Sequence, residues 1–288
     1  RKIQHSMGTM YHAEVPLKIE IPLVSDLGIE YVLQVEGRAD GIIADINYDE
    51  DGNKEPESDA IIDEIKTMQT DVSLLKEPVY VHKAQALVYG YIYASQKKLS
   101  KIGIQMTYVT PEPETINKFL EEYTFERIEE WFNKLITGFK RWTDYTFDER
   151  HKRTESIREL KFPYEYREGQ KNLCVSVYRA IEDNTNLYIQ APTGVGKTLS
   201  TVFPAVQALG QQMSDKIFYL TSKTITRTVA EDTYAILRDN GLHMRTVTLT
   251  AKDKICPLDE RNCNPVACPY AKGHFDRVND AVYELLAS

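Results

Sequence analysis

The stretch "NLYIQAPTGVGKTLS" (residues 186–200) constrains the fold more than any other part of this chain. Ala191 is followed, after four residues, by Gly196-Lys197-Thr198, which is the spacing of a phosphate-binding loop. Such a loop lies between a strand and a helix, because its backbone N–H groups and the helix N-terminus both face phosphate oxygens. The apolar run before the loop and the helical pattern after it predict that arrangement.

This loop predicts an ATP site. We expect Lys197 to contact the β- and γ-phosphates and the Thr198 hydroxyl to ligate Mg²⁺. The candidate ATP-binding residues of the loop are Ala191, Pro192, Thr193, Gly194, Val195, Gly196, Lys197 and Thr198.

The flanking sequence predicts a parallel α/β core around the loop. Strand-like runs at 186–190, 216–222 and 245–251 alternate with helical patterns at 197–211 and 224–241. We therefore assign residues 161–288 to one nucleotide-binding α/β lobe.

Two motifs give this lobe a family resemblance. The loop reads "APTGVGKT", and "FPYEYREGQKNL" precedes it. Together they resemble superfamily 2 helicases, in particular the iron–sulfur XPD/DinG group, which implies that this chain holds part of a RecA-like lobe. The resemblance implies that Phe162 and Gln170 recognise adenine, which suits a carboxamide because it can both donate and accept. It also implies that residues of "YLTSKTITRTVAED" hold single-stranded DNA, namely Thr221, Ser222, Lys223, Thr224 and Arg227.

The helicase resemblance implies an ATP-dependent DNA helicase that translocates 5′ to 3′ in DNA repair or replication. No DEAH-like box follows the loop, since the pair Asp259-Glu260 lies among the cysteines. We therefore expect the magnesium-binding box to lie beyond Ser288 and this chain alone to hydrolyse ATP poorly. The alternatives are a P-loop kinase and a DNA-binding module with degraded sites.

Three of the four cysteines fall in one short segment, with the spacing Cys256-x6-Cys263-x4-Cys268. In a reducing compartment such a cluster favours metal binding over disulfides. The helicase resemblance implies that they are three ligands of a [4Fe–4S] cluster, with the fourth beyond Ser288. The alternative is a zinc Cys₃His site completed by His274. We expect Cys174 to be a core thiol.

The first part of the chain contains a second candidate site. Glu64 and Lys66 lie two apart on a predicted strand and share a face, and Asp40 can reach that face from a neighbouring strand. The pattern resembles the PD-(D/E)xK nucleases, and "HKAQALVYGY" supplies the Gln85 and Tyr89 of their RecB-type branch. The resemblance implies Mg²⁺ or Mn²⁺ on the two carboxylates, with Lys66 positioning water.

We expect an α/β protein in three parts: a PD-(D/E)xK nuclease-like domain at 1–114, a helical connector at 115–160, and the lobe at 161–288 with its cysteine cluster at 252–288. Strands are predicted at 14–23, 31–46, 59–67 and 101–110, a helix at 80–98 and an acidic loop at 47–58.

Composition and charge narrow the class of protein and its location. The net charge is −8, and residues 1–118 hold 12 Lys+Arg against 19 Asp+Glu, which argues against a wholly basic nucleic-acid binder. No apolar run reaches the length of about 18 residues that a membrane span needs. With no leader pattern at the start, we expect a cytoplasmic protein that contacts no membrane; no protein partner can be inferred.

Overall fold

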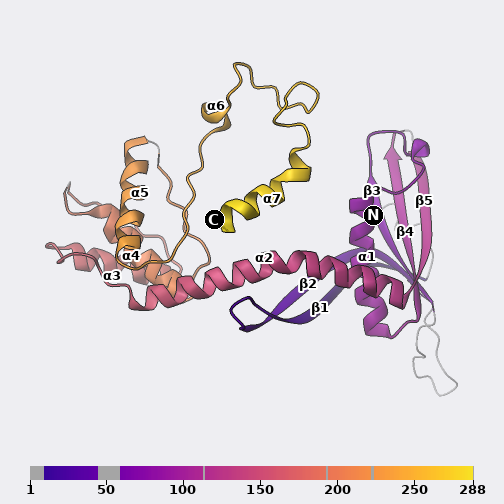
Figure 1. The fold of residues 1–288 in the computed structure, drawn as a ribbon, viewed down its shortest axis with the longest axis horizontal. Coiled ribbons are helices and arrows are strands. Elements are labelled where there is room, and N and C mark those ends of the chain that lie inside the picture. Colours follow the sequence, from indigo (N-terminus) through magenta and orange to yellow (C-terminus); the bar gives the residue numbers. More distant parts are fainter. Residues whose placement is uncertain (1–9, 45–58, 113, 193, 222–223, 288) are drawn as a thin grey trace. The chain divides into compact units, whose positions relative to one another are not determined.

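A computed structural model describes residues 10–44, 59–112, 114–192, 194–221 and 224–287 (Figure 1). The predicted acidic loop at 47–58 and residues 45 and 46 of a predicted strand lie outside this part. The chain forms two compact units, Arg1–Tyr145 and Thr146–Ser288. The boundary between them falls inside one helix, α2, and each unit is described by itself.

The first unit is built on a five-stranded sheet in the order β1-β2-β3-β4-β5. Only β3 and β4 are parallel, whereas the other neighbours are antiparallel. The four predicted strands are confirmed as β1 Tyr11–Val24, β2 Glu30–Ala44, β3 Ala60–Thr67 and β4 Lys101–Pro111, and the fifth strand is β5 Glu114–Thr124.

The crossover between the parallel strands β3 and β4 runs through the short helix η2 (Val72–Leu74) and then α1 (Tyr80–Lys97). The predicted helix is therefore confirmed. A parallel pair requires such a crossover, and α1 covers one face of the sheet (Figure 1). Its apolar side packs on Ile62, Ile104 and Met106 of the sheet, all of which are almost fully buried.

The strand β5 corrects the expectation of a helical connector beginning at residue 115. Residues 114–124 pair antiparallel with β4, and their exposed and buried side chains alternate. Charged side chains make the segment look helical, but its period is two, with Phe119 and Tyr123 on the core side. The helical part begins only at Phe125.

Close to the hairpin turn, residues of β1 and β2 hydrogen-bond to helix α2 (Phe125–Glu159). The Tyr31 hydroxyl donates to Asp144 Oδ1 at 2.6 Å and lies 2.7 Å from Thr143 Oγ1. Lys140 pairs with Asp144 and donates to the Val24 carbonyl at 2.7 Å. These bonds satisfy the buried Asp144 carboxylate and fix the hairpin against the helix.

The second unit consists of helices in the described part of the chain. The long helix α2 contributes its last turns, and no described helix is apolar enough over a sufficient length to cross a membrane. The other helices are α3 Gln170–Glu182, α4 Lys197–Gly210, α5 Thr224–Asp239, α6 Lys252–Ile255 and α7 His274–Ala287. Their core joins α2, α4 and α5 through Ile157, Leu160, Leu199, Val202, Val206, Leu209, Tyr234, Leu237 and Leu242.

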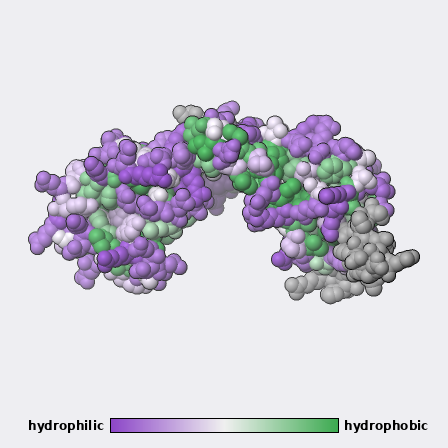
Figure 2. Space-filling view, turned by 90° about the horizontal axis from the view of Figure 1, so that it is seen from below, coloured by the Kyte–Doolittle hydropathy of each residue, from purple (hydrophilic) through white to green (hydrophobic). Residues whose placement is uncertain are grey.

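The expected parallel sheet of the second unit is not formed by the residues that the structure describes. The segments 186–190, 216–221 and 245–251 have no strand pairing. Tyr188, Leu220 and Leu249 are 93%, 89% and 86% exposed. Residue types give a segment a preference for extended backbone, whereas a strand also needs a neighbour to satisfy its N–H and C=O groups. Figure 2 shows hydrophobic residues among hydrophilic ones on the face that it presents.

Candidate functional sites

The acidic site of the first unit forms where β2 and β3 lie side by side. Asp40 directly precedes Gly41, the first residue of β2 that pairs with β3, and its Oδ2 accepts the Ile65 N–H at 2.8 Å. On β3, Lys66 Nζ donates to Glu64 Oε1 at 2.6 Å. The structure therefore brings together the two carboxylates and the ammonium that the sequence predicted.

Glu64 is the most buried of the three charged groups in this site. It is 1% exposed, and its Oε2 atom has no hydrogen-bond partner in the described part of the chain. Burial raises the pKa of the Glu64 carboxyl; the hydrogen bond from Lys66 opposes this shift, and the charge of Asp40 adds to it. A cation beside Oε2 would compensate the charge of this unpaired, buried oxygen.

The donor set fits a hard divalent cation, although only in part. Asp40 and Glu64 offer the oxygen ligands that Mg²⁺ and Mn²⁺ prefer, and Mg²⁺ commonly takes one or two carboxylates with water completing its shell. Within the described ranges, no group of three His, Cys, Asp or Glu side chains is gathered as a metal site. Two carboxylates are thus the protein ligands that these residues can supply.

Helix α1 places its predicted pair over the same face. Gln85 Oε1 accepts from Lys66 Nζ at 2.9 Å, and Gln85 Nε2 donates to the Tyr89 hydroxyl at 3.2 Å. Tyr89 lies against Gly37 of β2, where a Cβ atom would come within 2.6 Å of the Tyr89 hydroxyl. Glu64, Lys66, Gln85 and Tyr89 therefore form one continuous chain of contacts.

Sequence reasoning missed His82, which also lies on this part of α1. Its Nδ1 atom is 3.3 Å from the hydroxyl of Tyr108. Tyr108 is the β4 neighbour of Lys66 in the parallel register. The spacing of three residues between His82 and Gln85 is the signal that could have found it, since such residues share a helix face.

The phosphate loop of the second unit has the backbone that its glycines predict. Gly194 and Gly196 have φ of +87° and +75°, a region that side chains rarely adopt. Gly196 is the N-cap of α4, so the helix N-terminus begins at the loop. Lys197 Nζ is exposed and donates to the carbonyls of Ala191 at 3.0 Å and Pro192 at 2.8 Å. Thr193 lies outside the described residues.

The predicted adenine-recognition residues lie next to this loop. Gln170 is buried, and its Oε1 accepts the Arg167 N–H at 3.0 Å. A Cβ atom on Gly196 would come within 2.6 Å of Gln170 Nε2, so the carboxamide lies directly against the loop. Phe162 stacks on Tyr166 with ring centroids 4.2 Å apart. The motif before the loop and the loop itself therefore form one site.

Arg167 is a second residue that sequence reasoning missed. Its guanidinium donates to the Gly194 carbonyl, while its backbone N–H holds Gln170. The signal was its position inside "YREGQ", three residues before Gln170.

The predicted DNA-binding stretch is only partly described. Ser222 and Lys223 lie outside the described residues, and the side chain of Thr224 is not described. The Thr221 hydroxyl contacts that of Thr226. Arg227 pairs with Glu231 at 3.6 Å, so a phosphate would have to compete with that carboxylate for the guanidinium. These contacts leave the DNA-binding prediction untested.

The three clustered cysteines do not form a metal site in the described structure. Cys268 is buried, Cys263 is exposed and Cys256 is intermediate, and no three-ligand group is found there. Cys263 instead hydrogen-bonds Lys252, which raises the pKa of that ammonium. In the described residues these thiols are not gathered into the geometry of either a [4Fe–4S] or a zinc site.

Cys174 is the buried thiol that the sequence predicted. It lies on α3, and burial raises the pKa of its thiol while a hydrogen bond with Ser200 opposes that shift. A raised pKa disfavours the thiolate that metal binding requires.

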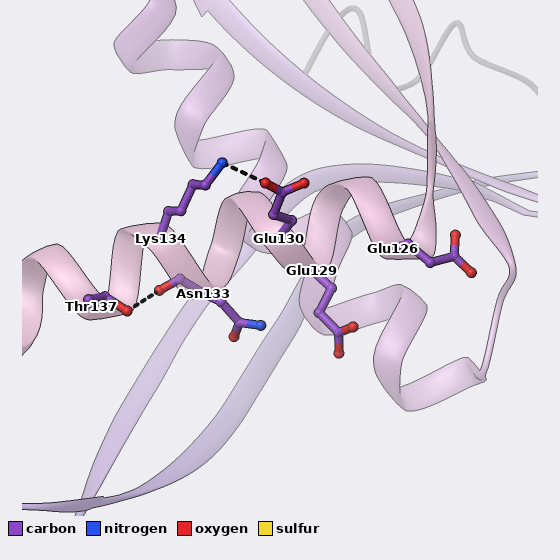
Figure 3. A pocket seen from close by; sticks show the side chains of 6 residues that line it. All are labelled: Glu126, Glu129, Glu130, Asn133, Lys134 and Thr137. Atoms are coloured by element: carbon purple, nitrogen blue, oxygen red, sulfur yellow. Dashed lines mark hydrogen bonds and ion pairs between the residues drawn. The ribbon is translucent and has the colours of Figure 1, made fainter.

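A shallow hollow of about 490 Å³ along α2 carries none of the predicted residues (Figure 3). Its only drawn ion pair joins Lys134 to Glu130 at 2.6 Å, one helical turn apart. Exposed pairs of this kind contribute little to stability, because water screens them. The remaining lining residues are Glu126, Glu129, Asn133 and Thr137, and nothing in the hollow suggests a ligand.

Comparison with known proteins supports the nucleotide site. Residues 168–261 match the DEAD/DEAH box helicase family. The matched segment begins two residues before Gln170 and contains the whole phosphate loop. This part of the chain is therefore similar to DEAD/DEAH box helicases, which favours a helicase over a kinase.

Individual proteins add little to that family match. A probable ATP-dependent helicase, MJ0942 of Methanocaldococcus jannaschii, is 49% identical over 47 residues, which span 16% of this chain and 7% of that protein. The crystal structure of SSO0001 is similar over 44% of this chain and 50% of that one, with 24% identity and a TM-score of 0.27. Because that TM-score is low, the second likeness carries no argument here.

The geometry of the loop predicts that Lys197→Ala abolishes ATP binding while the chain stays folded. The ammonium is exposed and bonds only backbone carbonyls of its own loop, so its removal takes no partner from the core. Calorimetric titration with ATP and Mg²⁺ measures the affinity, and circular dichroism checks the fold.

Lys216→Ala, outside the phosphate loop, is the control and should bind ATP as the wild type does. Unchanged ATP affinity in folded Lys197→Ala would contradict the assignment of this site.

Proposed function

We propose that this chain is part of an ATP-dependent DNA helicase whose phosphate loop drives movement along single-stranded DNA. The observation that carries the proposal is the contact of Gln170 with Gly196, which joins the adenine-recognition motif to the phosphate loop inside the segment that matches helicases. Lys197 would exchange its carbonyl partners for phosphate oxygens, and the Thr198 hydroxyl would ligate Mg²⁺. ATP hydrolysis is the activity typical of that family.

The finer assignment is to the XPD/DinG type, with 5′-to-3′ translocation and a role in DNA repair or replication in the cytoplasm. Its support is the pair of motifs around the loop and the cysteine spacing that follows them. We propose that Cys256, Cys263 and Cys268 are gathered only when a [4Fe–4S] cluster binds, because metal binding and local folding are commonly coupled. When bound, the cluster would organise this segment of the lobe.

If the cluster reading is correct, iron content should depend on the clustered thiols and not on Cys174. Anaerobically purified wild type and Cys174→Ser should hold equal iron per chain, whereas Cys263→Ser should lose it, because each thiolate holds one corner of the cluster. Elemental analysis for iron and zinc makes the measurement. Zinc without iron would favour the Cys₃His alternative, and equal iron in Cys263→Ser and wild type would exclude the cluster.

We also propose that residues 1–114, together with β5, form a PD-(D/E)xK nuclease-like domain that cuts single-stranded DNA, followed by a helical connector ending near residue 160. A Mg²⁺ or Mn²⁺ ion on Asp40 and Glu64 would act as a Lewis acid on a phosphodiester. The unpartnered, buried Oε2 atom of Glu64 is the observation that carries this proposal. Lys66 holds Glu64 Oε1 in place and is positioned to orient the attacking water.

The nuclease proposal predicts cleavage of end-labelled single-stranded DNA in Mn²⁺ without ATP. Glu64→Ala should abolish cleavage because it removes a cation ligand. Lys66→Ala should slow the reaction by about 10²–10⁴-fold, the range for a group that assists proton transfer.

Two control variants make this assay selective. Glu36→Ala removes an exposed carboxylate of β2 and should cleave at the wild-type rate. Lys197→Ala should do the same, because the acidic site needs no residue of the phosphate loop. Cleavage that survives Glu64→Ala, or that disappears with Lys197→Ala, would refute the assignment.

A further inference from the structure

His82 lies beside the acidic site but takes part in none of the contacts assigned to it so far. It precedes Gln85 by about one helical turn, so both side chains stand on one face of α1. Its ring contacts that of Tyr108, with centroids 5.9 Å apart. Because Tyr108 is paired with Lys66 in the sheet register, His82 lies near the end of the Glu64–Lys66 pair.

The hydrogen bonds around Tyr108 favour one tautomer of His82, the one in which Tyr108 donates and Nδ1 accepts. The buried Tyr108 hydroxyl oxygen accepts the Val79 N–H at 2.9 Å, which leaves its own hydrogen to donate. The nearest acceptor for that hydrogen is His82 Nδ1, at 3.3 Å. In the neutral imidazole the proton is then on Nε2, because one nitrogen accepts and the other donates.

The surroundings also keep this imidazole neutral. Burial lowers the pKa of His82, and the positive charge of Lys66 lowers it further. In the part of the chain that the structure describes, Nε2 has no hydrogen-bond partner. His82 thus presents an N–H donor close enough to Lys66 to feel its charge, without adding a charge that would repel a cation.

We propose that His82 binds the DNA substrate through its Nε2–H, which donates to a non-bridging phosphate oxygen of the strand in the acidic site. This inference rests on the proposed nuclease function and names a substrate contact within it. Lys66 already donates to Glu64 and Gln85, and its remaining N–H is assigned to the attacking water, so a separate donor is needed to hold the strand. Contacts to phosphate fix the register of a strand without reading its sequence, which suits a nuclease without base preference.

The experiment compares His82→Leu, His82→Gln and a control, His151→Leu, which changes an exposed histidine on α2. Mn²⁺-dependent cleavage of a single-stranded oligonucleotide gives KM and kcat. Fluorescence anisotropy, with Ca²⁺ in place of Mn²⁺, gives the affinity for the same oligonucleotide.

We expect His82→Leu to raise KM and weaken DNA binding by about tenfold or more, the loss of one hydrogen bond to a charged acceptor, with a smaller change in kcat. His82→Gln should restore most of the binding, because its carboxamide also offers an N–H. His151→Leu should behave as the wild type. An imidazole ¹⁵N spectrum should show the Nε2–H tautomer for His82 in the wild type.

The outcomes separate this inference from the function on which it rests. Cleavage by the wild type with unchanged KM and affinity in His82→Leu overturns the inference alone. Equal losses in His82→Leu and His82→Gln, with matching losses of melting temperature, assign His82 a structural role instead. An Nδ1–H tautomer also overturns it. A wild type that binds DNA but never cleaves it refutes the nuclease, and the affinity ratio still decides the role of His82. A wild type that neither binds nor cleaves overturns both.

Discussion

The parallel pairing of β3 with β4 is the constraint on which the candidate nuclease site depends. Parallel neighbours cannot be joined by a tight turn, so the chain must cross the sheet, and here it does so as α1. Side chains alternate along β3, so Glu64 and Lys66 face the crossing helix together. Gln85 and His82 then approach the same face from above without any loop having to position them.

The position of Glu64 on β3, under the crossing helix, also has an electrostatic consequence. Placing a carboxylate where it is 1% exposed costs several kcal/mol unless it is paired, and Lys66 pairs only one of the two oxygens of Glu64. The same burial strengthens any interaction with a cation, because the effective dielectric constant is lower than that of water. On the proposed function, this geometry trades stability of the sheet for affinity toward a cation, as functional sites often do.

The sequence predicted what is local and missed what depends on distant partners. Four strands, α1, the phosphate loop and the Glu64–Lys66 pair follow from spacing, because the period of an element decides which side chains share a face. Gln85 came from the resemblance to RecB-type nucleases. The strand β5 was missed because its charges concealed a period of two. The paired strands expected at 186–190, 216–222 and 245–251 were wrong for the described residues, since no residue type specifies its neighbour. The helical spacing of His82 and Gln85 could have pointed to His82, but its contact with Tyr108, which is 26 residues away in sequence, needed the structure.

The central claim is that the first unit binds a catalytic cation independently of the ATP site. Titration calorimetry of Mn²⁺ into the nucleotide-free protein tests it most directly, because the phosphate loop binds its cation only together with a nucleotide. The account predicts one site in the wild type, its loss in Glu64→Gln, and its retention in both Lys66→Ala and Lys197→Ala. Equal stoichiometry and affinity in wild type and Glu64→Gln would contradict the account.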